Sequence, residues 1–270
     1  MTIRQLTTSL AILAASSAFT HAGTPAPPPP PPPPEPVSLW SGSVTVGYDT
    51  DYIYRGFEVF DGTAYARDLV TAALDLNFQV NDRLTWNFNA WYGNSFETDS
   101  SYDELDLYTR LLYKVNDSFS FGPSFKYYYY PVFDGTNYDE QFEPGLEFVW
   151  VPCANTTVNF GAYYETESEA FYAELGVSHV FKLNDTFSLV PGAVVSYVDR
   201  EDSAFAPSSS DFNHAAIYLK APITLRKNLT VTPYVAVNFP LDGVDELTAV
   251  FPLPDQDEEI YGGVAVSVGF

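Results

Sequence analysis

Twelve charged side chains fall on one side of extended segments whose other side is apolar. They are Asp49, Asp51, Arg55, Asp75, Asp106, Arg110, Lys114, Lys126, Glu143, Glu147, Glu174 and Lys220. Side chains at alternate positions of a strand share one face, so these groups would line one wall of a sheet. Such a wall could be braced by ion pairs, or it could line a pore and sort passing solutes by their charge.

Two pairs within this set suggest where such sorting would occur. Asp51 and Arg55 are predicted near one mouth of the passage, and Asp106 and Arg110 share a face of one strand. Each pair is either a bracing salt bridge or part of a charged constriction. The excess of acidic groups would then favour cations or neutral polar solutes.

The elements that must position these groups are strands. From Ser41 onward, twelve segments alternate with a period of two, and their apolar faces hold no Asp, Glu, Lys or Arg. The last segment, from Glu258 to Phe270, sets Val264 and Val268 against small residues and ends on an aromatic side chain. A wall that faces lipid selects this pattern, because a charge at mid-bilayer costs roughly 2–4 kcal/mol.

Aromatic side chains gather at both ends of the predicted strands. One end would carry Trp86, Phe119, Trp150, Phe187 and Phe270. The other end would carry Tyr52, Tyr54, Tyr92, Tyr129, Tyr164 and Tyr197, with the first strand extending through Tyr54. Two aromatic belts fit two membrane interfaces. The sequence therefore predicts an all-β protein, a transmembrane antiparallel up-and-down β-barrel of about 12 strands.

The connections between strands alternate in length. Short turns contain Asn-Asp at positions 81–82, 116–117 and 184–185, where these residues hydrogen-bond their own backbone. The long loops are mostly acidic, and they cover 55–69, 93–103, 130–140, 198–211 and 240–259. Short turns on one side and long loops on the other match the periplasmic and external ends of an outer-membrane barrel. The acidic loops are either simply solvated or bind divalent cations.

Composition and the N-terminal segment indicate where the protein is located and which partners it could bind. The chain has 12 Lys and Arg against 35 Asp and Glu, a net charge of −23 that argues against nucleic acid as a partner. We predict a cleaved signal peptide over 1–22, a proline-rich linker over 23–40 and the barrel over 41–270. The linker is either a stiff spacer or a tether for a partner. The expected partners are outer-membrane lipid and, through the strand that ends at Phe270, the barrel-assembly machinery.

Histidine and cysteine are too scarce to favour an enzyme. Some twelve-stranded barrels are phospholipases with a Ser–His pair on the lipid-facing wall, but the segments beside His179 present no Ser or Cys on that face. His21 lies in the predicted signal peptide, and His214 is predicted to face inward near the mouth. We expect no catalytic residues, no cofactor and no metal centre, and Cys153 should be a spectator thiol.

Two stretches resemble a known family. Thr50-Asp51-Tyr52-Ile53-Tyr54-Arg55-Gly56 is similar to the signature that opens the TorF-type porins of Gram-negative bacteria, and Glu104-Leu105-Asp106-Leu107-Tyr108 is similar to a later element of that family. The resemblance implies a Gram-negative outer-membrane barrel. The expected function is passive diffusion of small polar or cationic solutes. The alternative is a non-conducting structural or adhesive barrel with acidic external loops and a periplasmic proline-rich arm.

Overall fold

The structure, a computed structural model, describes residues 39–60, 67–96, 101–131, 140–201, 208–244 and 256–270. The predicted signal peptide and all but the end of the predicted linker lie outside these residues. Strand β1 begins at Trp40.

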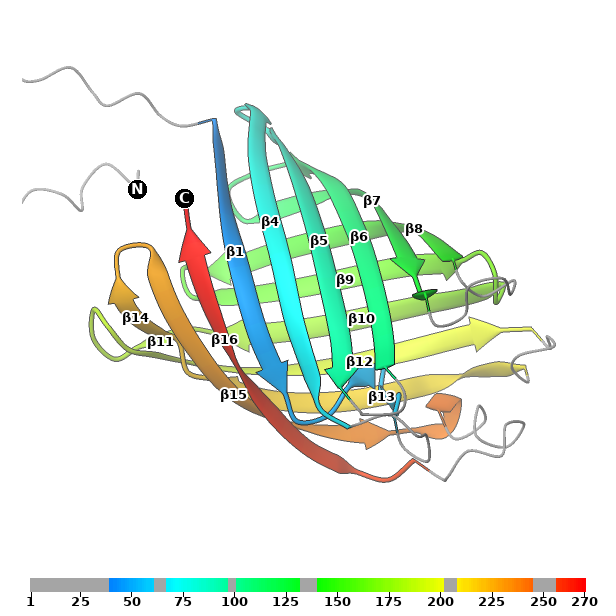
Figure 1. Ribbon diagram of the computed structural model, residues 1–270. Helices are drawn as coiled ribbons and strands as arrows, with labels where there is room; N and C mark the ends of the chain where they lie inside the picture. The colour runs from blue at the N-terminus through cyan, green and yellow to red at the C-terminus, as the bar shows by residue number, and fades with distance from the viewer. Residues whose placement is uncertain (1–38, 61–66, 97–100, 132–139, 202–207, 245–255) are drawn as a thin grey trace, which may run out of the picture. The chain divides into compact units, whose positions relative to one another are not determined.

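Twelve antiparallel strands form the barrel wall (Figure 1). In chain order they are β1 (Trp40–Asp49), β4 (Leu69–Asn81), β5 (Leu84–Phe96), β6 (Ser101–Lys114), β7 (Phe119–Tyr129), β8 (Glu140–Cys153), β9 (Thr156–Glu165), β10 (Ala170–His179), β12 (Ser188–Arg200), β13 (Ser209–Lys220), β15 (Leu229–Pro240) and β16 (Glu259–Gly269). Short β11 (Phe181–Lys182) pairs with β12, and β14 (Ile223–Arg226) pairs with β15. The predicted class and strand number are confirmed.

The barrel closes where its first and last wall strands meet. Val46 of β1 lies opposite Val266 of β16 on one side and opposite Ala72 of β4 on the other. The Gly42 amide donates to the Phe270 carbonyl oxygen at 3.0 Å, and the Phe270 amide donates to the Gly42 carbonyl oxygen at 2.9 Å. A closed sheet leaves no unpaired edge, which lets strands cross a bilayer.

Large apolar side chains cover the outside of the barrel. Val46, Phe125, Leu146 and Ile217 are 51–59% exposed, and they come from four different strands. Such a continuous apolar surface would be costly in water and is suited to hydrocarbon. The predicted outward faces are therefore correct along most of the wall. None of the described segments forms a helix long and apolar enough to cross a membrane.

The short turns form by the predicted mechanism. The Asn81 side-chain oxygen accepts from the amide of Arg83, that of Asn116 from Ser118, and that of Asn184 from Thr186, each at 2.9 Å. These bonds satisfy the backbone between strands without help from elsewhere in the fold.

The first strand is shorter than predicted. It ends at Asp49, and the chain then bends into the barrel, so Tyr52 packs on Phe60, Trp91 and Tyr102 with ring centroids 5.7–6.1 Å apart. The placement of Tyr52 and Tyr54 in an outer belt was therefore wrong. Residues 55–60 of the predicted external loop are likewise inside the barrel. Tyrosine suits both a lipid interface and a polar interior, so alternation alone could not distinguish a continued strand from an inward bend.

Candidate functional site

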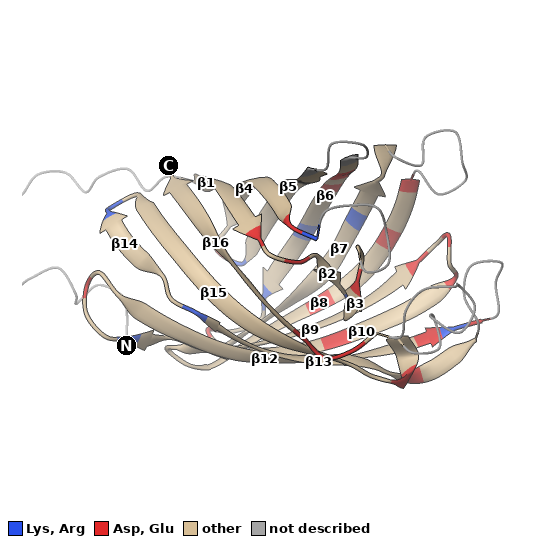
Figure 2. Ribbon diagram, turned by 60° about the horizontal axis from the view of Figure 1, so that its bottom comes forward, with Lys and Arg blue, Asp and Glu red and all other residues tan. Residues whose placement is uncertain are grey.

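A two-stranded hairpin occupies the barrel lumen (Figure 2). Strands β2 (Ile53–Tyr54) and β3 (Phe57–Glu58) pair, and Arg55 and Gly56 form the turn with φ angles of 50° and 86°. Positive φ at both turn positions is typical of the tight turns that match strand twist. Glycine is required at the second position, because a β-carbon there would clash with Cβ and Cγ of His214.

The hairpin tip docks on the far side of the barrel from β1. The Arg55 guanidinium pairs with Glu143 on β8, lies 3.8 Å from Glu165 on β9, and stacks 4.0 Å from the ring centroid of Tyr172 on β10. Strand β9 is equally far from β1 in both directions round the barrel. The hairpin therefore crosses the lumen.

Backbone contacts fix the same turn. The Asn213 amide donates to the Arg55 carbonyl oxygen at 2.6 Å, and the Asn238 amide donates to the Gly56 carbonyl oxygen at 2.8 Å. Both asparagines are buried. Each turn carbonyl thus has a side-chain donor from the wall, which satisfies polar backbone that no strand partner reaches.

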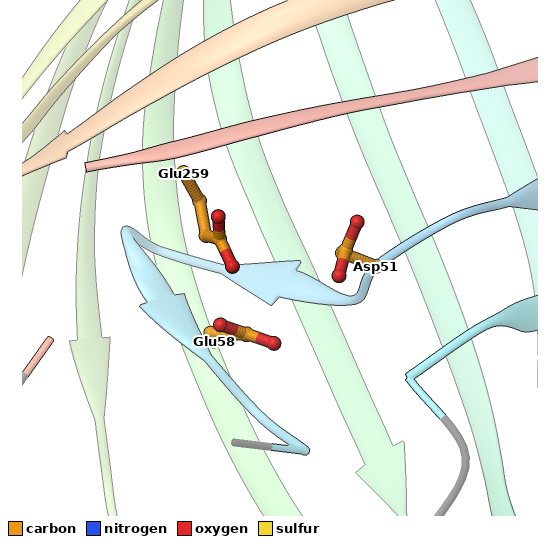
Figure 3. Close-up of side chains that lie close together, drawn as sticks. All are labelled: Asp51, Glu58 and Glu259. Atoms are coloured by element: carbon orange, nitrogen blue, oxygen red, sulfur yellow. The ribbon is translucent and has the colours of Figure 1, made fainter. Parts of the chain in front are cut away.

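The base of the hairpin is held by one arginine among three carboxylates, and Figure 3 shows the three carboxylates. Arg67 pairs with Asp51 at 3.0 Å, with Glu58 of β3 and with Glu259 of β16. The three acids come from separate segments, and their oxygens lie within 4.8 Å of one another. Carboxylates in this arrangement could hold a divalent cation, but the arginine already supplies the opposing charge.

A small apolar cluster anchors the chain where the hairpin leaves the lumen. Phe60, Leu69 and Tyr102 are each at most 4% exposed, and the rings of Phe60 and Tyr102 meet edge to face at 5.0 Å. Burial of such side chains stabilises by roughly 1.5–3 kcal/mol each. The hairpin is therefore fixed by apolar contacts as well as by charge.

The charged wall residues pair across strands rather than along them. Glu143 contacts Arg55 and, at 3.0 Å, Lys126, while Glu147 pairs with Arg110 at 2.8 Å. The predicted pairs Asp51–Arg55 and Asp106–Arg110 do not form. Positions four apart on a strand are separated by about 13 Å at 3.3 Å per residue, whereas neighbouring strands lie about 4.8 Å apart.

The remaining predicted pore-lining residues have modest partners. Tyr234 donates to Asp49 at 2.6 Å, Asn89 to Asp75 at 2.8 Å, and Tyr172 to Glu174 at 2.9 Å. The Lys220 ammonium lies 5.0 Å from the ring centroid of Tyr218. Lys114 is at the strand end, where its ion pair at 2.8 Å lowers the pKa of the turn residue Asp117, so it belongs to the rim.

Sequence reasoning missed several buried polar groups of the lumen. Glu104 is fully buried and accepts from the hydroxyls of Tyr52 at 2.6 Å and Tyr102 at 2.8 Å. Strand parity could have found it, because it lies two residues before Asp106. The same parity would have pointed Glu165 inward, because it follows the outward Tyr164 on β9. Arg67 and Glu58 carry no comparable signal, because a bend and the short strand β3 of the hairpin place them.

Two histidines make hydroxyl contacts. The inward orientation predicted for His214 is confirmed, and its Nδ1 lies 2.6 Å from Ser196 Oγ, a pair that the sequence did not suggest. Both residues are buried beneath the hairpin turn. His179 Nδ1 contacts Thr156 Oγ1 at 2.8 Å, and that hydroxyl contacts Cys153 Sγ at 3.0 Å. The serine–histidine pair thus lies inside the barrel, unlike that of a lipid-facing hydrolase.

Comparison with known proteins identifies the fold. No known family model matches this sequence, and no curated protein matches it. The chain is similar to an outer membrane channel from Pseudomonas putida F1, with 14% identity, a TM-score of 0.53 and coverage of 87% of this chain and 97% of that one. It is similar to the NanC porin, with 9% identity, a TM-score of 0.51 and coverage of 84% and 98%.

The KdgM porin is a further similar structure, with 11% identity, a TM-score of 0.50 and coverage of 84% of this chain and 99% of that one. All three are β-barrels of the outer-membrane porin and channel type, so this chain has the fold of such proteins. At such low sequence identity, the similarity establishes only that the fold is shared. The TorF-type resemblance stays a prediction.

Proposed function

We propose that this chain is a passive channel of the Gram-negative outer membrane for small polar or cationic solutes. The observation that carries this proposal is a closed barrel with an apolar outside and an interior wall of charged and hydroxyl-bearing side chains. A water-filled route needs a polar interior wall, and contact with lipid needs an apolar, uncharged outer surface. Carboxylates outnumber cations on the wall, which supports a preference for cations.

A non-conducting structural or adhesive barrel is the second candidate. The hairpin that crosses the lumen favours it, since Arg55 and the carbonyls of the turn are fixed by five different wall strands. In this proposal the barrel serves as a scaffold for its acidic external loops and its proline-rich arm. This barrel would transport nothing, so it would need no open route beside the hairpin.

Conductance in a planar bilayer separates the two candidates. The purified full chain in a KCl gradient should give stepwise currents and a reversal potential displaced toward that of K⁺. Glu174→Gln should reduce this displacement, because it removes a carboxylate of the lumen wall that has no Lys or Arg within 4 Å among the described residues. Asp117→Asn, at an exposed turn, should leave it unchanged. Silence at all voltages would exclude the channel.

The same proposal includes two classes of partner. Outer-membrane lipid would surround the apolar wall, and the barrel-assembly machinery would engage the last strand, which ends beside Phe270. Divalent cations at the acidic loops remain a prediction, because three acids of the last loop, Asp245, Glu246 and Asp255, lie outside the described residues. Glu259 of the same loop is described, and Arg67 provides its counter-charge.

A further inference from the structure

A cavity of about 460 Å³ lies between the hairpin and the inward faces of β5 to β9. Six aromatic side chains contribute most of its wall: Tyr52, Tyr54, Trp91, Tyr108, Tyr128 and Tyr163. The polar members of the lining include Asn89, Asp106, Lys126 and Glu147. A volume in the range of about 300–1,000 Å³, an aromatic lining and a few polar groups are typical of small-molecule sites.

The carboxylates around this cavity are not all neutralised. Glu143, Glu147 and Glu165 each have an arginine or lysine nitrogen within 4 Å. Glu104 and Asp106, two residues apart on the inward face of β6, have no such partner among the described residues. Their two carboxyl groups hydrogen-bond each other, so either a proton that the two share or a cation bound in the cavity must compensate the charge of this pair.

Of Glu104 and Asp106, Asp106 is the one that lines the cavity. Glu104 is fully buried, and the hydroxyls of Tyr52 and Tyr102 both bond to its Oε2. Asp106 lines the cavity, and its Oδ1 accepts no hydrogen bond from the described residues. A ligand that donates hydrogen bonds or carries positive charge would give this oxygen the partner that it lacks.

In the lumen, lysine and arginine side chains of the protein itself are each held between a carboxylate and the face of an aromatic ring. Lys126 Nζ lies 3.0 Å from Glu143 and 3.6 Å from the ring centroid of Tyr163. Arg55 combines Glu143 with the ring of Tyr172 in the same way. A cation over an aromatic ring is attracted by the negative face of the ring, by about 2 kcal/mol or more when water is excluded.

The cavity offers the same pairing with no resident cation on it. Tyr52 and Trp91 stack with an interplanar angle of 28°, and no Lys or Arg of the described chain lies over either ring. Asp106 shares the cavity with both. The site thus combines a carboxyl group that has no Lys or Arg within 4 Å with aromatic rings that no Lys or Arg of the described chain covers, which is the chemistry that recognises substituted ammonium ions.

We infer that this cavity is a binding site for a small organic ammonium ion, held by Asp106 and the Tyr52–Trp91 surface. The inference rests on the proposed channel function and narrows its solutes to organic amines. An uncharged polyol on the same aromatic surface is the competing occupant. It would not depend on the charge of Asp106.

Titration of the full-length protein in detergent with choline at constant ionic strength tests the site. We expect saturable heat of binding and saturable quenching of tryptophan fluorescence. The uncharged carbon analogue 3,3-dimethylbutan-1-ol, which has the shape of choline without its charge, should bind at least about tenfold more weakly. This comparison needs no variant. Equal binding of the two compounds, or the absence of saturation with choline, would overturn the inference.

Asp106→Asn should weaken choline binding about tenfold or more, since one tenfold step corresponds to about 1.4 kcal/mol. Asp49→Asn makes the same change on a lumen strand outside the cavity and should leave choline binding unchanged. Wild-type affinity in Asp106→Asn, or saturable glucose binding in place of choline, would also overturn the inference. Currents in KCl without choline binding would refute this site and leave the channel, whereas choline binding by a silent barrel would refute the channel and leave the site.

Discussion

Arg55 and Glu143 form an ion pair across the lumen, although 88 residues separate them in the sequence. One lies at the tip of the β2–β3 hairpin, and the other is a fully buried residue of the opposite wall. Lys126 shares the same carboxylate. This junction connects the first inward segment of the chain to the strands that complete the barrel, so it is one of the contacts that hold the hairpin tip in the lumen.

Replacing Arg55 with Met should release the hairpin tip. Breaking a buried ion pair from one side costs about 3–5 kcal/mol, because the remaining charge loses its partner. Single-channel conductance should rise about twofold or more, with larger current fluctuations, as the lumen clears. Arg83→Met, at an exposed turn, is the matched control, and heat-modifiable migration on gels would verify that both variants fold. Unchanged conductance in Arg55→Met would mean that the hairpin does not restrict the passage.

Gly56→Ala should disturb the same turn without changing any charge. The new β-carbon would clash with His214, and the φ angle of 86° is unfavourable for a residue with a side chain. We expect a loss of about 1–3 kcal/mol in the stability of the docked hairpin. Faster protease cleavage after the first strand would report it.

Gly176→Ala is the control for that substitution. Gly176 lies on the inward face of β10, and the nearest atom to an added β-carbon there is 3.7 Å away, an ordinary contact. Equal protease sensitivity of the two alanine variants would contradict the role assigned to Gly56.

The strands were predictable because each one carries its own signal. Val46, Leu146 and Ile217 alternate with small or polar neighbours whatever the rest of the chain does, and lipid imposes this pattern locally. The hairpin was not predictable in the same way. Tyr52 and Tyr54 continue the alternation of β1 while the backbone bends inward, and the partners that retain them, such as Glu104, lie on distant strands. The alternation along each strand predicts which side chains face the lumen, but it does not predict which of those side chains form ion pairs with one another.

Arg67→Gln should convert the base of the hairpin into a calcium-dependent site. Without the guanidinium, the carboxylates of Asp51, Glu58 and Glu259 would remain within 4.8 Å of one another and repel. The variant should melt at a lower temperature in chelator, and millimolar Ca²⁺ should restore most of the loss, because hard cations prefer carboxylate oxygens. The wild-type protein should respond little to Ca²⁺. An equal response of both proteins would show that Arg67 does not neutralise this cluster.

Leu146→Arg tests whether the apolar wall faces hydrocarbon. Leu146 lies in the middle of β8, points outward and is 51% exposed, so an arginine there would sit near the bilayer centre. The expected loss in unfolding free energy in lipid vesicles is roughly 2–4 kcal/mol. Leu183→Arg, on an equally exposed leucine at a short turn, should cost about 0–1 kcal/mol, because the side chain reaches the interface. Similar, small losses for both variants in vesicles would mean that this wall contacts water or protein instead of lipid.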